Sequence, residues 1–242
     1  MTPIFEGEGK RALDRYLHRL EGHGSAVSVV DMHTGGEPLR IITGGLPLIE
    51  GADVLEKRRF FRDRLDHIRT GLMWEPRGHA DMYGAVLSRS STADFDVFFL
   101  HNEGYSTMCG HAIIALTKFV AEAGLVDRAE VTFNVPAGRI EARAHWEGEV
   151  VRTTSFKNVP SFVYRSDQCV DVPGYGPVDY DITFGGAFYA IVDAKTLGLS
   201  LEKADIGRLI EAGRAIKRAV AESIPIDHPH GPDLSFLYGT IL

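Results

Sequence analysis

The segment Asp31-Met-His-Thr-Gly-Gly-Glu-Pro-Leu-Arg-Ile-Ile42 has a second version in the same chain, Asp181-Ile-Thr-Phe-Gly-Gly-Ala-Phe-Tyr-Ala-Ile-Val192. Both contain an aspartate, a glycine pair and an apolar tail, which is typical of two strands joined by a tight turn. Further along, Met82-Tyr-Gly-Ala-Val-Leu87 matches Leu237-Tyr-Gly-Thr-Ile-Leu242. The offsets of 150 and 155 residues nearly agree, so the chain is predicted to hold two homologous lobes.

Helical periodicity follows each copy of the glycine-pair segment. Apolar residues at helical spacing mark one helix at Val54, Phe61, Leu65, Ile68 and Leu72, and another at Ile206, Leu209, Ile210, Ile216 and Val220. A third helix, predicted from about 109 to 123, has almost no polar face and ends at Gly124. We expect it to be buried on all sides. Strands are expected at 26–30, 38–42, 82–87, 97–100, 130–134, 139–145 and 150–159.

These patterns divide the chain into three parts. Residues 1–25 are interpreted as an extension with a short amphipathic helix, 26–165 as the first lobe, and 166–242 as an incomplete second lobe. The apolar face of the extension is formed by Leu13, Tyr16, Leu17 and Leu20. Cys109 lies 26 residues after Tyr83, whereas only four residues follow Tyr238. The second buried helix, and the group opposite Cys109, are therefore expected beyond Leu242.

Composition narrows the class of protein. The 242 residues are 44% hydrophobic and 24% charged, as in an ordinary globular protein. No stretch reaches the roughly 20 apolar residues of a membrane span, and residues 1–8 contain no apolar signal region. With two cysteines, a reducing cytoplasm is expected. The net charge of −7 argues against nucleic acid and membrane surfaces as partners.

Cys109 is the residue that most strongly suggests chemistry. It lies in His101-Asn-Glu-Gly-Tyr-Ser-Thr-Met-Cys-Gly-His-Ala112, at the start of the predicted buried helix. Unpaired amide hydrogens at a helix start favour a thiolate and also suit a carboxylate ligand. Gly110 would let a ligand approach the backbone. Such a site suits removal of an α-proton from an amino acid, although an inert buried cysteine is equally consistent with position alone.

Three separated motifs resemble the proline racemase family: Asp31–Arg40, Glu75-Pro-Arg-Gly-His-Ala-Asp-Met-Tyr-Gly-Ala85 and Met108-Cys-Gly-His111. The resemblance runs from about Ser28 to Leu242 and is strongest to the trans-3-hydroxy-L-proline dehydratase branch. It implies an α+β fold like that of diaminopimelate epimerase, with strands wrapped around a central helix in each of two lobes and the second lobe truncated here. It also implies cofactor-independent catalysis, with Cys109 as the base, Gly110 and His111 binding the substrate carboxylate, and Tyr83 lining the proline ring.

The resemblance leaves two reactions open. Two thiols on opposite faces of the substrate can invert its α-carbon, as in a hydroxyproline 2-epimerase or proline racemase. One thiol facing a Thr or Ser favours loss of the 3-hydroxyl, and the enamine formed tautomerises to pyrroline-2-carboxylate. We predict dehydration of trans-3-hydroxy-L-proline; epimerisation or racemisation of proline-type amino acids, and an inactive fragment, remain the alternatives.

Other residues are predicted to be structural. Cys169 matches no catalytic position, and the histidines lack the spacing of a metal site, so no metal is expected. The glycine pairs are turn glycines, because the G-x-G-x-x-G spacing of dinucleotide sites is absent. A homodimer is compatible with the exposed strand edges that an incomplete lobe would leave.

Overall fold

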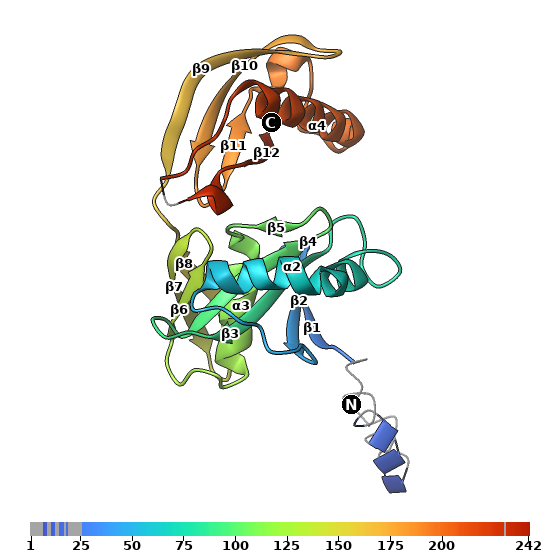
Figure 1. Ribbon diagram of the computed structural model, residues 1–242, viewed down its shortest axis with the longest axis vertical. Coiled ribbons are helices and arrows are strands. Elements are labelled where there is room, and N and C mark those ends of the chain that lie inside the picture. The colour runs from blue at the N-terminus through green and yellow to red at the C-terminus, as the bar shows by residue number, and fades with distance from the viewer. Residues whose placement is uncertain (1–6, 9–10, 13–14, 17, 19–25, 230) are drawn as a thin grey trace.

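The computed structural model describes residues 7–8, 11–12, 15–16, 18, 26–229 and 231–242, arranged in two lobes (Figure 1). The first lobe contains an eight-stranded sheet in the order β1-β2-β3-β4-β6-β7-β8, with β5 paired to β4; the second contains a four-stranded sheet in the order β12-β11-β10-β9. The predicted α+β fold is therefore confirmed. Of the predicted face of the N-terminal extension, Leu13, Leu17 and Leu20 lie outside the described residues.

The helices and strands follow the predicted sequence of elements. The first lobe comprises β1 (Ser28–Thr34), β2 (Glu37–Gly44), α2 (Val54–Met73), β3 (Tyr83–Arg89), β4 (Phe95–His101), β5 (Tyr105–Ser106), α3 (Gly110–Glu122), β6 (Glu130–Val135), β7 (Gly138–Glu147) and β8 (Val150–Lys157). The second comprises β9 (Phe162–Val172), β10 (Gly176–Phe184), β11 (Phe188–Ile191), α4 (Ile206–Ser223) and β12 (Leu237–Ile241), with short 3₁₀ turns η1 (Ala194–Leu197), η2 (Lys203–Asp205) and η3 (Pro232–Leu234).

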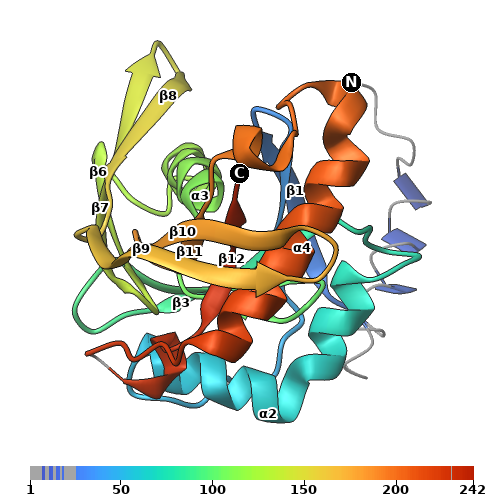
Figure 2. The same ribbon diagram turned by 90° about the horizontal axis from the view of Figure 1, so that it is seen from above.

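Helix α3 forms the centre of the first lobe. The sheet curls around it, and α3 contacts β1, β2, β7 and β8 (Figure 2). Its side chains Ile113, Leu116 and Val120 are fully buried, each contributing about 1.5–3 kcal/mol of transfer free energy. The helix stops where Gly124 adopts φ +66°, a left-handed conformation that glycine accepts without strain. Most of this helix is buried as predicted, but not on all sides, because the side chains of Lys118 and Glu122 remain partly exposed and pair with each other.

Helix α2 covers the outer face of the same sheet. Its N-cap Asp53 accepts a 2.9 Å hydrogen bond from the backbone N–H of Glu56. Phe61 and Met73 on one face of the helix are fully buried, and Phe61 packs against Phe98 of β4 with ring centroids 5.4 Å apart. This layer leaves the other face of the sheet free to enclose α3.

The internal repeat is visible in the topology. In the first lobe an antiparallel hairpin, β1–β2, is followed by α2 and then by β3, which pairs parallel to β2. In the second lobe the antiparallel pair β10–β11 is followed by α4 and then by β12, which pairs parallel to β11. The two predicted pseudo-repeated lobes are therefore confirmed.

The connection between the two sheets lies at residues 158–161, between β8 and β9. Strand β9 is continuous from Phe162 to Val172 and belongs wholly to the second sheet. We propose that the lobes meet at this connection, a few residues before the predicted boundary at 165. The sequence expectation did not include β9 as a strand starting at Phe162.

Candidate active site at the start of the buried helix

Cys109 lies where the chain enters α3, facing the second lobe. It is the N-cap residue of this helix, with extended backbone angles φ −146° and ψ 109°, and its carbonyl accepts a 3.1 Å hydrogen bond from Ile113 N–H. The preceding Thr107 donates its hydroxyl to the Gly186 carbonyl in the β10–β11 turn. The predicted position at a helix start is observed, and it lies at the contact between the lobes.

The electrostatics of this thiol differ from the sequence expectation. The amide hydrogens of His111 and Ala112 and the hydroxyl of Tyr83 each lower the pKa of Cys109. Burial works in the opposite direction and is larger, because only 7% of the residue is exposed. The net result raises the pKa of Cys109 to about 12, whereas we expected the helix start to favour a thiolate. The unliganded site therefore holds a neutral thiol.

His111 lies close to the thiol in the first turn of α3. Its Nδ1 is 3.3 Å from Sγ of Cys109, and its carbonyl accepts a 2.9 Å hydrogen bond from the Thr34 hydroxyl in the β1–β2 turn. Burial lowers the pKa of His111, so the imidazole is neutral near pH 7. A Cβ added at Gly110 would meet only the ring edge of Phe156, at 3.4 Å. The roles of Gly110 and His111 as carboxylate ligands stay predictions.

Tyr83 stands on β3 beside the thiol. Its hydroxyl shares a hydrogen bond with the hydroxyl of the fully buried Ser106. Its ring lies edge-on to the His111 ring at 5.0 Å and stacks on the His101 ring at 5.8 Å. Burial raises the pKa of Tyr83 well above its ordinary value, so the phenol stays protonated. The predicted aromatic wall is thus adjacent to the predicted base.

Two aromatic residues that we did not assign to the site reach it from the second lobe. Tyr238, on β12, lies edge-on to His101 at 5.7 Å and contacts Tyr189 of β11 at 5.5 Å. A hydrogen bond to Tyr83 lowers the pKa of Tyr238, although burial raises it more. Tyr238 occupies the repeat position equivalent to Tyr83, so the repeat itself could have identified it.

His101 is a further residue that the sequence did not single out. Its Nδ1 accepts a 3.2 Å hydrogen bond from Glu103 N–H, and burial lowers the pKa of His101 to about 4. The proton of the neutral ring therefore belongs on Nε2, which is buried and has no hydrogen-bond partner among the described residues. The site thus contains a buried donor between Tyr83 and Tyr238.

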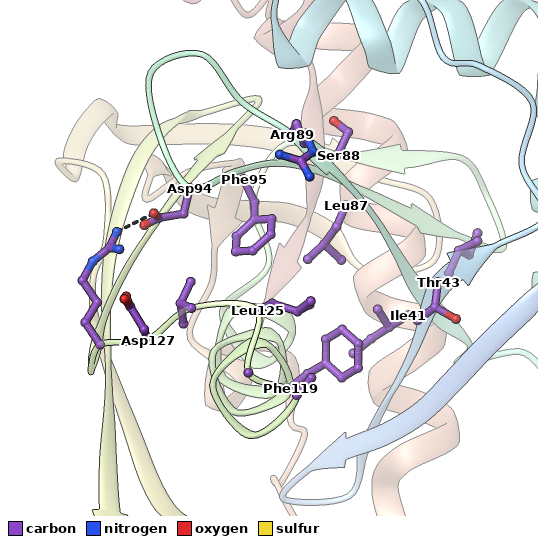
Figure 3. A pocket seen from close by; sticks show the side chains of 15 residues that line it. Ile41, Thr43, Leu87, Ser88, Arg89, Asp94, Phe95, Phe119, Leu125 and Asp127 are labelled. Carbon is purple, nitrogen blue, oxygen red and sulfur yellow. Dashed lines mark hydrogen bonds and ion pairs between the residues drawn. The ribbon is translucent and has the colours of Figure 1, made fainter.

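Other features lie away from Cys109. The cavity in Figure 3, about 940 Å³, lies at the opposite end of α3 and is lined by residues that include Phe119 and Leu125. Cys169 is exposed on β9. Within the described ranges, no group of three or more His, Cys, Asp or Glu side chains is arranged to hold a metal ion, and no helix has the length and apolarity of a membrane span.

The fold and site define a class: a two-lobed α+β protein built on an internal repeat, with a thiol at a helix start between the lobes. The family model for proline racemase matches residues 29–242. The chain belongs to the proline racemase family.

Relatives and solved structures agree with this assignment. A trans-L-3-hydroxyproline dehydratase from Xenopus tropicalis is 48% identical over 93% of this chain and 67% of its own length. A 3-hydroxyproline 2-epimerase from Burkholderia multivorans is 44% identical over 90% of this chain and 67% of its own length. The crystal structure of a hydroxyproline epimerase from Agrobacterium vitis with bound trans-4-hydroxy-L-proline superposes with a TM-score of 0.83 at 28% identity, over 88% of this chain and 65% of that one. The chain spans 62% of the length of one curated dehydratase and 68% of the length of another.

Proposed function

We propose that the protein containing this chain dehydrates trans-3-hydroxy-L-proline to pyrroline-2-carboxylate without a cofactor. Cys109 is the base that removes the α-proton. The observation that carries the proposal is the placement of this thiol at the N-terminus of a buried helix that faces the second lobe. Two curated relatives that are named for this activity are 48% and 51% identical to the chain.

The helix start can serve both the base and the substrate. Free N–H groups at its first turn suit the substrate carboxylate, next to the thiol that would attack the α-proton. We place the carboxylate at Gly110 and His111 and the ring against Tyr83. The substrate carries a positive ring nitrogen and a negative carboxylate on the α-carbon. Because the N–H groups of the helix start neutralise the carboxylate, the charge on the nitrogen lowers the pKa of the nearby thiol. Binding would thereby offset part of the desolvation that raises the pKa of Cys109 to about 12.

The alternative is epimerisation or racemisation of a proline-type amino acid. The 44% identity to a 3-hydroxyproline 2-epimerase supports it. The two reactions begin with the same proton removal and diverge at the carbanion, which either loses the 3-hydroxyl or is reprotonated on the opposite face. The preference for dehydration rests on the higher identity of the relatives named dehydratase.

We also propose where the protein acts, what it binds and how it assembles. We place it in the cytoplasm, with an amino acid as its small-molecule partner. Nucleic acid and membrane are not proposed as partners, because the net charge is −7. A homodimer is the assembly to test first.

The proposed function is tested by incubating the longest native form of the protein that contains this chain with trans-3-hydroxy-L-proline, trans-4-hydroxy-L-proline or L-proline. Proton NMR distinguishes loss of water from inversion at the α-carbon. We expect water loss from the first compound and no loss of activity on treatment with a chelator. Inversion of trans-4-hydroxy-L-proline or L-proline without consumption of trans-3-hydroxy-L-proline would establish the alternative. The Cys109→Ser variant serves as the inactive control.

A further inference from the structure

Dehydration requires an acid as well as a base, because hydroxide is a poor leaving group at neutral pH. The hydroxyl of Tyr83 is a proton donor close to Cys109. It hydrogen-bonds to Ser106, and it also lowers the pKa of Cys109 by hydrogen bonding to the thiolate. The base and this phenol therefore belong to the same lobe, and both lie against the His111 side chain, whose Nδ1 is 3.3 Å from Sγ of Cys109 and whose ring centroid is 5.0 Å from that of Tyr83.

The stereochemistry of the substrate specifies where the acid must stand. In trans-3-hydroxy-L-proline the 3-hydroxyl lies on the ring face opposite to the carboxylate. The α-hydrogen also lies opposite to the carboxylate, so the departing hydroxyl and the departing hydrogen share one face. A substrate held between two lobes presents that face to a single lobe. The acid must therefore come from the lobe that supplies Cys109.

We propose that Tyr83 is the general acid that protonates the departing 3-hydroxyl; this inference rests on the proposed dehydration. The thiolate of Cys109 takes the α-proton, and the electrons of the broken C–H bond form the C=C bond as the C–O bond breaks. The Tyr83 hydroxyl gives its proton to the leaving oxygen, which departs as water. The Cys109 thiol then returns its proton to the phenolate across the same hydrogen bond, and both groups regain their starting states.

Among the hydroxyl and imidazole N–H donors on this side of the site, the phenol of Tyr83 has the lowest ordinary pKa, and burial raises the pKa of Tyr83 above that value. The nearby hydroxyl of Ser106 and the N–H of a neutral imidazole both release a proton less readily than a phenol does. His111 is neutral, because burial lowers its pKa. Ser106 is fully buried behind the phenol, where its hydroxyl can stabilise the phenolate that forms during the reaction. Tyr83 thus donates the proton, and Ser106 stabilises the phenolate that remains.

The test separates proton removal from water loss in the longest native form of the protein. Water loss is measured with trans-3-hydroxy-L-proline. Proton removal is measured as deuterium exchange at the α-carbon of L-proline in D₂O, since L-proline has no leaving group. For Tyr83→Phe we expect water loss to fall by about 10² or more, while exchange falls by less than about tenfold. The stereochemical probe is cis-3-hydroxy-L-proline, which should exchange its α-hydrogen without losing water.

Tyr164→Phe is the matched control, because it removes a half-buried phenolic hydroxyl on β9 whose partner is the Asp227 N–H rather than a residue of the site, and it should keep water loss within about threefold of wild type. Equal losses of exchange and water loss in Tyr83→Phe, or retention of both, would overturn the assignment of the acid and leave the proposed dehydration standing. A loss in Tyr164→Phe as large as in Tyr83→Phe would overturn it as well. Wild-type protein that exchanges the α-hydrogen but never releases water would overturn both proposals.

Discussion

The two glycine-pair turns have the same backbone conformation but different surroundings. Gly36 in the β1–β2 turn has φ +106°, and Gly186 at the equivalent repeat position has φ +107°. A Cβ at Gly36 would meet no atom within 4 Å, whereas a Cβ at Gly186 would lie 2.6 Å from Cβ of Met108, the residue before Cys109. The repeat thus preserved the turn itself, while the second-lobe copy acquired a close contact with the start of α3.

The strands that follow the two turns also differ in how they pair. Arg40 of β2 pairs with Gly84 of β3, but in the second lobe Gly239 pairs with Tyr189, one residue before the position equivalent to Arg40. A bulge between Phe188 and Tyr189 accounts for this shift. Such local shifts change which side chains face the other lobe without altering the topology. The matched segments of the two lobes therefore share one topology and differ where the lobes contact each other.

The largest difference expected between the lobes is that between their cysteines. Replacing Cys109 with Ser should reduce activity on trans-3-hydroxy-L-proline by on the order of 10³-fold or more, because the proposed base is lost. Replacing the exposed Cys169 with Ser should leave the rate within about twofold of wild type. Steady-state kinetics on the two variants make the measurement. A Cys169→Ser variant as inactive as Cys109→Ser would contradict the assignment of the base to the first lobe.

The ion pairs that join the lobes differ in burial. Removing the buried pair should therefore lower the free energy of unfolding more than removing the exposed pair. Asp233 on η3 pairs with the buried Arg58 of α2 at 3.2 Å, whereas Lys217 of α4 and Glu103 form an exposed pair at 3.6 Å. Asp233→Ala leaves a buried guanidinium without its partner and should lower the free energy of unfolding by about 3–5 kcal/mol. Glu103→Gln should lower it by less than about 1 kcal/mol. Urea denaturation measures both, and equal losses would show that burial does not decide the strength of these contacts.

The matched glycines provide the next comparison. Alanine at Gly36 or at Gly186 adopts an unfavourable positive φ, so both variants are strained to a similar extent. Gly186→Ala must also displace Met108, which adds about 1–3 kcal/mol of overpacking. Thermal unfolding should therefore place Gly186→Ala below Gly36→Ala in stability. Identical melting temperatures for the two variants would mean that Met108 moves aside without a loss of stability.

The sequence predicted the repeat, the buried helix and the position of Cys109, because these depend on local periodicity and on residue types that recur at fixed offsets. It did not predict the pKa of Cys109, since that value reflects burial between lobes that are distant in sequence. The contribution of Tyr238 required knowing that β12 lies opposite His101. The unpartnered Nε2 of His101 likewise follows from packing, which no single segment of the sequence encodes.

The smallest perturbation, alkylation of a thiol, tests the environment of Cys109 against that of Cys169. At pH 8 only a minute fraction of Cys109 is thiolate if its pKa is about 12, and the group is also buried, so iodoacetamide should modify Cys169 at least about tenfold faster. Between pH 7 and pH 10 the rate at Cys109 should rise by about tenfold per pH unit without levelling.

The same pKa has a consequence for stability. An unfolded thiol titrates near pH 8.5, below the folded value, so the burial of neutral Cys109 stabilises the fold fully below about pH 8.5. That contribution is lost progressively as the pH rises from there towards 12. Cys109→Ala should remove this alkaline dependence, as measured by urea denaturation between pH 7 and pH 10, whereas Cys169→Ala should retain it. An alkylation rate at Cys109 that levels off near pH 7 would show instead that the amide hydrogens of α3 outweigh burial, and that the base is ionised before the substrate arrives.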